Sequence, residues 1–130
     1  MISDILAGLA QTLDQVDGLR AFDRQPESIS PPTVICEPNE LTYDVTLDGC
    51  FDLGLKITVL VSRADARTSQ SVLYDYIDPG TSTIKGALDS EPTLGGTVSY
   101  WDNFRYTGMG LFTVAGVDYL GVTFELVAHT

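Results

Sequence analysis

The chain has 130 residues, of which 44% are hydrophobic and 19% charged, and this composition is typical of one globular domain. Its 18 Asp and Glu residues against seven Lys and Arg give a formal net charge of -11. That excess of negative charge argues against a protein that binds DNA or an anionic membrane, because such proteins need clustered cations.

The first segment of the chain predicts an amphipathic helix over residues 2–16. Its apolar residues recur at steps of three and four and so share one face: Ile2, Leu6, Leu9, Leu13 and Val16. Ser3 or Asp4 can cap its start, and Gly18 stands where a helix terminator is expected. No Lys or Arg precedes the apolar residues, so we expect no secretory signal, and no apolar run approaches the roughly 18 residues of a membrane span.

The next part of the chain is dominated by strand patterns. A short strand is predicted near 18–22, an extended Pro-rich surface segment over 24–32, and a further strand over 33–37. Apolar and polar or small residues then alternate in two runs, at 41–48 and 53–62. Because Asp48-Gly49 is a favourable turn pair, these two runs predict a β-hairpin.

Helical spacing returns after residue 63. Val72, Leu73, Tyr76 and Ile77 form a stripe, with Asp65 as a plausible N-cap and Pro79-Gly80 as a stop, and a second short helix is predicted over 83–89. A strand over 97–107 follows, and a hairpin over 110–126 turns at Ala115-Gly116. We therefore predict a single domain over 1–130 of the α+β class, with a mostly antiparallel or mixed sheet and two to three helices packed on one face.

Reactive side chains are scarce. His129, the only histidine, is next to last in the chain, where chain ends tend to fray, so it is a poor candidate for a positioned base. Together with His129, Cys36 and Cys50 make three Cys and His residues in total, which is too few for a zinc site. We expect both cysteines to be free thiols, and a single disulfide bridge between them is the alternative. No glycine-rich phosphate loop is present.

Three carboxylates, Asp44, Asp48 and Asp52, are spaced by four but lack a calcium-loop pattern, so we expect a solvated loop. We thus predict no catalytic residue, no cofactor, no metal and no enzymatic activity. Carboxylate-only chemistry such as glycoside hydrolysis is the alternative left open.

Residues 99–108 hold four aromatic side chains. In a regular strand, Trp101 would lie on one face of the sheet and Tyr100, Phe104 and Tyr106 on the other. We expect one of these faces to pack in the core and the other to form a protein–protein interface. A base-stacking platform would also need a cationic groove, and only Arg105 is nearby.

A second candidate contact is the pair Arg63 and Arg67, which flanks Asp65 and could anchor to an acidic neighbour; ordinary surface arginines are the alternative. The predicted subunit or tail interface therefore consists of Arg63, Asp65, Arg67, Tyr100, Trp101, Phe104 and Tyr106.

An ordered series of segments carries a family resemblance. It runs from "MISDILAGLAQTLDQVDGLRAF" through "SISPPTVIC", "ITVLVSRADARTSQSVLYDYID" and "STIKGALDSEPTLGG" to "TVAGVDYLGVTFEL". In this order and spacing, over nearly the whole chain, the sequence resembles the tail terminator proteins of long-tailed, siphovirus-type phages, particularly those that infect actinobacteria. Residues 37–52 contribute least to the likeness.

The resemblance implies a structural virion protein rather than an enzyme. Such subunits assemble as a ring, typically a hexamer, that caps the finished tail tube and stops polymerisation of the major tail tube protein. The ring also docks on the head–tail connector or stopper protein, and genomic DNA passes through its lumen without specific binding. The implied location is the virion tail neck, after assembly in the host cytoplasm and without a membrane. A head-completion or stopper neck protein and a small acidic binding or inhibitor module are the alternatives.

Overall fold

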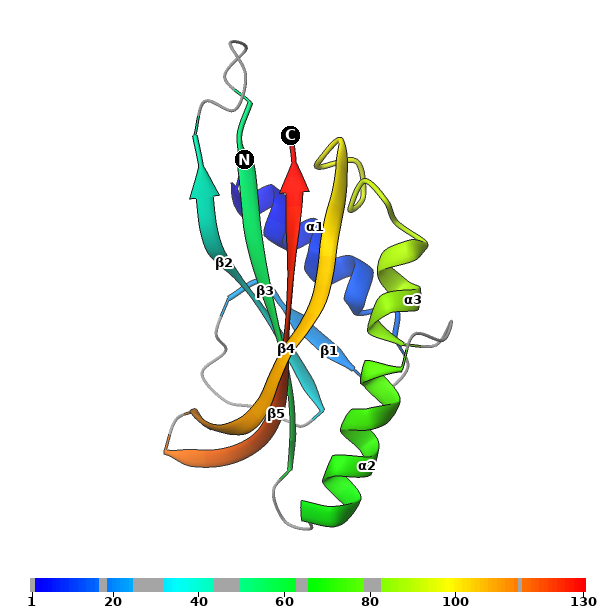
Figure 1. The fold of residues 1–130 in the computed structure, drawn as a ribbon, viewed down its shortest axis with the longest axis vertical. Coiled ribbons are helices and arrows are strands. Elements are labelled where there is room, and N and C mark those ends of the chain that lie inside the picture. Colours follow the sequence, from blue (N-terminus) through cyan, green and yellow to red (C-terminus); the bar gives the residue numbers. More distant parts are fainter. Residues whose placement is uncertain are drawn as a thin grey trace.

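The computed structural model describes residues 2–16, 19–24, 32–43, 50–62, 66–78, 83–114 and 116–130, which form one five-stranded sheet and three helices (Figure 1). In chain order these elements are α1 (Ile2–Leu13), β1 (Arg20–Phe22), β2 (Thr33–Thr42), β3 (Asp52–Ser62), α2 (Ala66–Ile77), α3 (Ile84–Asp89), β4 (Tyr100–Val114) and β5 (Val117–His129). The predicted α+β class is confirmed. Among these residues, each helix is too short or too polar to cross a membrane.

The sheet is mixed, with the strand order β1-β2-β3-β5-β4. β1 pairs with β2 in parallel, and the other neighbouring strands of this order pair antiparallel. The C-terminal strand β5 therefore lies inside the sheet, with β3 on one side and β4 on the other. Both edges of this strand are hydrogen-bonded as far as His129, so its backbone is paired on both sides up to the end of the strand.

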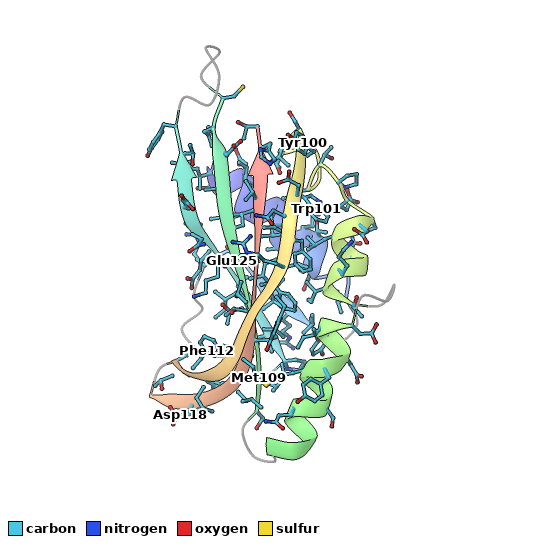
Figure 2. All side chains as sticks on the ribbon, viewed as in Figure 1. Tyr100, Trp101, Met109, Phe112, Asp118 and Glu125 are labelled. Atoms are coloured by element: carbon cyan, nitrogen blue, oxygen red, sulfur yellow. The ribbon has the colours of Figure 1, made fainter. Side chains whose placement is uncertain are left out.

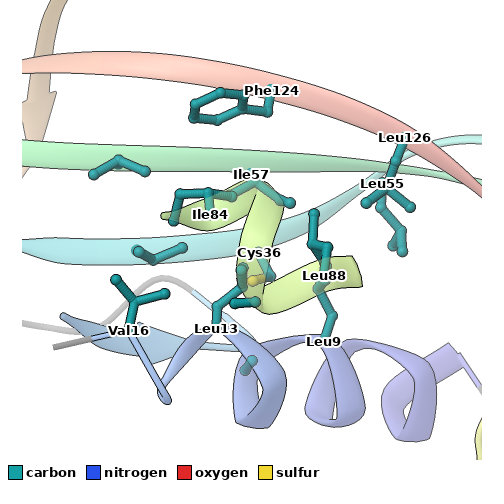
Figure 3. Packing of buried hydrophobic residues seen from close by; sticks show 14 of the residues in the cluster. Leu9, Leu13, Val16, Cys36, Leu55, Ile57, Ile84, Leu88, Phe124 and Leu126 are labelled. Carbon is teal, nitrogen blue, oxygen red and sulfur yellow. The ribbon is translucent and has the colours of Figure 1, made fainter. Parts of the chain in front are cut away.

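One face of the sheet is covered by the helices, which join it in a single apolar core. Leu9 and Leu13 of α1 point toward Leu88 of α3 and Cys36 of β2 (Figure 3). Burial raises the pKa of the Cys36 thiol, and the nearby Asp23 and Glu37 carboxylates add to the shift. Both cysteines are free, as predicted.

The alternation predicted for β3 is confirmed by its burial. Five residues of this strand are buried against the helices: Leu53, Leu55, Ile57, Val59 and Val61. The opposite face of the sheet, called the open face below, carries Lys56 and Thr58 from the same strand. In the described residues no helix joins the apolar cluster of that face.

Three predicted boundaries are corrected. Helix α1 ends at Leu13 and not at residue 16, because hydrogen bonds of the i→i+3 type from Gln15 and Val16 tighten its last turn. Ser3 and Asp4 lie within the first turn and do not precede it. The predicted strand at 33–37 and the first two residues of the one predicted at 41–48, Leu41 and Thr42, belong to a single strand, β2, whose pairing shifts between Pro38 and Glu40. Residues 44–48 lie outside the described residues.

The stripe predicted for the second helix is only partly buried. Leu73 is fully buried, whereas Val72 is 36% exposed and belongs to the solvent side of α2. The short helix predicted at 83–89 is confirmed as α3, with the Thr83 hydroxyl accepting a hydrogen bond from the backbone N–H of Gly86 at its start. The caps and turns predicted at Gly18, Asp48-Gly49, Asp65 and Pro79-Gly80 lie outside the described residues.

Candidate functional site

The aromatic strand β4 does not alternate as a regular strand would. Its pairing with β5 shifts between Asp102 and Arg105, and Asn103 has a positive φ of 56°. This β-bulge resets the alternation, so Trp101 and Phe104 both pack against the helix-side core. The prediction that Trp101 faces away from Phe104 is therefore wrong.

The two half-buried rings help to fix β4 to the core. Trp101 and Phe104 meet edge to face, with centroids 6.2 Å apart, and Phe104 stacks on Phe124 of β5 at 5.3 Å. The indole N–H of Trp101 donates a hydrogen bond to the Glu91 carbonyl oxygen at 3.3 Å. These two residues of the predicted interface therefore serve packing inside the subunit.

The other two predicted aromatics remain available to a partner. Tyr100 is 52% exposed and Tyr106 is 45% exposed, so both keep about half of their surface in water. Tyr100 lies in register with His129 on the open face, and Tyr106 meets Phe124 edge to face at 6.0 Å on the helix side. Figure 2 shows Tyr100 and Trp101 together at the start of β4.

The arginine part of the predicted interface stays a prediction. Arg63 and Asp65 lie outside the described residues, and for Arg67 the structure describes only the helical backbone at the start of α2.

A row of charges of alternating sign crosses the open face. Glu37, Lys56, Glu125 and Arg105 come from the four strands β2, β3, β5 and β4 and lie opposite one another in register. An Arg105 Nη2 to Glu125 Oε2 distance of 3.4 Å makes one ion pair, and the Asn39 amide also donates to Glu125. Sequence spacing could not reveal this row, because it exists only once the register of four strands is set.

His129 is held on the open face, at the C-terminal end of β5, and does not fray. Its Nδ1 lies 2.7 Å from Asp52 Oδ1 and its Nε2 lies 2.7 Å from Asp102 Oδ1. Its ring stacks on Tyr100 at a centroid distance of 4.5 Å, and Thr130 beyond it bonds to Phe51. Ionised carboxylates only accept hydrogen bonds, so the protonated imidazolium, in which both ring nitrogens donate, is the form of the ring that this geometry favours.

The pKa of His129 reflects this arrangement. Partial burial by itself lowers the pKa, but hydrogen bonds to Asp102 and Asp52 and attraction to their charges outweigh it, so the pKa is raised. Because both nitrogens are engaged by carboxylates, the ring has none left to take a proton from a substrate. The cluster therefore ties the ends of β3, β4 and β5 together.

We expect folding stability to depend on pH through this cluster. A raised folded-state pKa means that the stabilisation is complete below the unfolded-state pKa of about 6.5 and is lost as pH rises through the folded-state value. Partly exposed ion pairs of this kind contribute about 0.2–1 kcal/mol. Urea unfolding of wild type and His129→Gln between about pH 5.5 and 9 tests this, and an identical pH dependence in both proteins would contradict it.

A second apolar cluster lies on the open face, where the end of the β4–β5 hairpin bends away from the plane of the sheet (Figure 1). Ile35, Leu60 and Val114 are buried in it, and Phe112 and Tyr119 pack around them. A cavity of about 210 Å³ opens beside this cluster. We call it the hairpin cavity; its apolar lining comes from Ile35, Leu60, Phe112 and Val114, and Glu37 and Lys56 supply its charged lining.

Sequence reasoning missed this cavity, although one signal was present. Leu60 stands between Val59 and Val61, so the alternation of β3 breaks into a continuous apolar run there. Such a run is typical of a strand that is buried on both faces. What buries the second face of Leu60 is the bent hairpin, which the strand pattern does not reveal.

The described side chains of the charged row, the His129 cluster and the hairpin cavity do not form an evident catalytic site. Across the described ranges, no group of three or more His, Cys, Asp or Glu side chains is placed to hold a metal ion. Asp52, one of the carboxylates considered for calcium, pairs with His129 instead, and the other two, Asp44 and Asp48, lie outside the described residues. What the arrangement offers is exposed surface of several kinds: a charged row, half-exposed aromatics and a cavity with both apolar and charged walls.

The sequence matches no protein-family model and none of the curated proteins with which it was compared.

Proposed function

We propose that this protein is the subunit of a ring that caps the tail tube of a long-tailed phage, stops its growth and joins the tail to the head–neck connector. The order of sequence features that resembles tail terminators supports this assignment. The observation that carries it is physical: the solvent side of α2, in the helix layer, and the open face of the sheet present two different exposed surfaces on opposite sides of the subunit. A head-to-tail ring needs such a pair, because each subunit uses one patch toward each neighbour.

The first surface is the solvent side of α2. Tyr74 is 58% exposed there, beside the exposed carboxylates of Asp75 and Asp78. The second surface is the open face, with its charged row and the hairpin cavity. The two surfaces differ in shape and chemistry, so two copies can meet through unlike patches, which is the contact that closes a ring. Permanent interfaces of this kind bury roughly 2,000–5,000 Å² in total.

The acidity of the chain suits this role. A formal charge of -11 per subunit, multiplied around a ring, gives the whole ring a negative potential that repels DNA phosphates. The genome can then pass through the lumen without being held.

We expect particles that lack this protein to carry tails of uncontrolled and excessive length, because nothing then ends polymerisation of the tube. Electron microscopy of negatively stained lysates measures tail length directly, and the protein supplied in trans should restore a uniform length. Tails of normal length with empty, leaking heads would place the protein one ring higher, as a stopper. A monomer that captures a basic host protein and is absent from virions would identify an acidic binding module.

A further inference from the structure

The row of alternating charges ends at the two borders of the open face. Glu37 stands at the β2 end of the row and Arg105 at the β4 end, with Lys56 and Glu125 between them. Each inner charge has an opposite charge in register on both sides, whereas Glu37 and Arg105 have one on a single side. Both end residues are exposed, and the Arg105 side chain is 46% exposed although it pairs with Glu125. The row is thus compensated inside the subunit and only half compensated at its ends.

Both borders are edges of the sheet within the described residues. β1 pairs with β2 only from Thr33 to Ile35, so the outer side of β2 from Glu37 to Thr42 has no described strand beside it. β4 is the last strand at the other edge, and in the upper half of Figure 1 β2 and β4 form opposite borders of the sheet. Such edges carry backbone N–H and C=O groups that another chain can approach.

The two edges do not favour an arbitrary extended chain. The pairing of β2 shifts between Pro38 and Glu40, and proline has no backbone N–H to donate. β4 has a bulge at Asn103 and a second shift between Tyr106 and Gly108. Bulges and edge prolines interrupt a regular ladder and so disfavour unspecific strand addition. A partner at these edges is therefore selected mainly by side chains.

The charges of the two borders favour a second copy of the chain that meets the first through unlike borders. The β2 border carries the acids Glu37 and Glu40 and no base, so two β2 borders would repel each other. On the β4 border, Asp102 is paired with His129, which leaves Arg105 as the cation that meets a neighbour. Two β4 borders would oppose one Arg105 to another, whereas a β2 border beside a β4 border places an acid next to a base.

The strand directions allow this contact in a ring. β2 is antiparallel to β3, β3 to β5 and β5 to β4, so β2 and β4 run in opposite directions and would meet as an antiparallel pair. Rotation about an axis along the strands keeps the direction of each strand and the level of each residue. Because Glu37 and Arg105 belong to one row, that rotation brings Arg105 of one copy to the level of Glu37 of the next.

We propose that Arg105 of one subunit pairs with Glu37 of a second copy, so that the row of alternating charges continues around the ring. This inference rests on the proposed ring and adds the borders of the open face to its contacts. A guanidinium group has five N–H donors, so Arg105 can keep Glu125 and also donate to Glu37 of the neighbour. The pair sets the order and direction of the subunits, while the larger surfaces supply the buried area.

Charge reversal at each end of the row is the first test. Arg105→Glu makes the net charge more negative and Glu37→Arg makes it less negative, yet each variant opposes like charges at every junction. Both should therefore raise the concentration needed for assembly by at least about tenfold. Mass photometry and electron microscopy of tail-tube ends mixed with the protein measure assembly, and circular dichroism confirms that each variant is folded.

Lys85→Glu, on α3, is the matched control. Lys85 has a side chain of similar exposure, 38%, and like Arg105 it pairs with an acid of its own chain, Asp89. Its reversal should leave assembly unchanged, because Lys85 does not belong to the charged row.

An equimolar mixture of the two row variants is the second test. At this level of the sheet, Glu37→Arg is basic at both borders and Arg105→Glu is acidic at both borders. The two proteins therefore complement each other at every junction of a ring in which they alternate. We expect the mixture to assemble within a few-fold of the wild-type concentration, at which neither variant assembles alone. One chain that carries both reversals should assemble likewise.

The outcomes separate the contact from the ring. If wild type assembles but the mixture shows no rescue, the two residues act only inside their own subunit, and the proposed pair is wrong while the ring stands. The same holds if Lys85→Glu weakens assembly as much as Arg105→Glu does, because net charge then controls assembly. If wild type neither assembles nor occupies tube ends, the ring is wrong and the pair with it.

Discussion

Replacing Phe124 with alanine is expected to lower the free energy of unfolding by about 3–5 kcal/mol, the largest loss that we expect from any single side chain. Phe124 is 2% exposed and stacks on Phe104 at 5.3 Å, with Tyr106 edge to face at 6.0 Å. Its removal deletes both ring pairs and leaves a cavity where β4 is joined to the core. Because whole domains are stable by about 5–15 kcal/mol, the variant should be folded only marginally.

Urea unfolding followed by circular dichroism measures the loss, and Phe124→Leu should retain more than half of the stability that Phe124→Ala removes. Leu111→Ala is the matched control. Leu111 belongs to the same hairpin but is 58% exposed, so its truncation should change stability by no more than about 0.5 kcal/mol. Equal losses in the Leu111 and Phe124 variants would mean that the hairpin does not pack as described.

Adding a single methyl group at Gly121 is expected to destabilise the protein by about 1–3 kcal/mol. A Cβ atom there would lie 2.7 Å from Leu60 Cδ2, 2.8 Å from Phe112 Cδ2 and 2.8 Å from the carbonyl oxygen of Val59. The carbonyl belongs to the central strand and cannot move aside, and both side chains are packed in the open-face cluster. Gly121→Ala must therefore push the bent hairpin away from Leu60.

The register of the sheet provides a close control for this change. Gly110 is paired directly with Gly121, yet a Cβ atom at Gly110 would meet nothing within 4 Å. Gly110→Ala should therefore be neutral or stabilise by up to about 1 kcal/mol, because alanine restricts the unfolded chain more than glycine does. The same substitution on two paired strands is thus expected to destabilise the protein at Gly121 and not at Gly110. Similar losses at both positions in thermal and urea unfolding would contradict the packing at Gly121.

Periodic segments were predicted well because each one carries its burial pattern within a few consecutive residues. The apolar steps of α1, the period-two pattern of β3 and the C-terminal hairpin all appear in the fold near the predicted positions. Their periods of 3.6 and 2 are local properties of a helix and a strand, so neighbouring residues are enough to reveal them. The α+β class followed from the order of these segments.

The facing of the aromatic strand and the fixed position of the only histidine were missed for a shared reason. The bulge at Asn103 turns Trp101 and Phe104 to the same face, and it is defined by the pairing of β4 with β5. His129 is fixed by Asp52 and Asp102, which are 77 and 27 residues away in the chain. Both outcomes depend on which strands become neighbours, and the residue pattern of a single strand does not reveal its neighbours.

By itself, the sequence determined the composition, the acidic charge, the kinds of elements and their order, because these depend on residue identity and short-range spacing. Only the tertiary structure decided that β5 lies between β3 and β4, that four strands align a row of charges, and that the hairpin bends over Leu60 to leave a cavity. Those features arise where residues distant in the chain meet, and long-range register, which the packing of the whole core selects, brings them together.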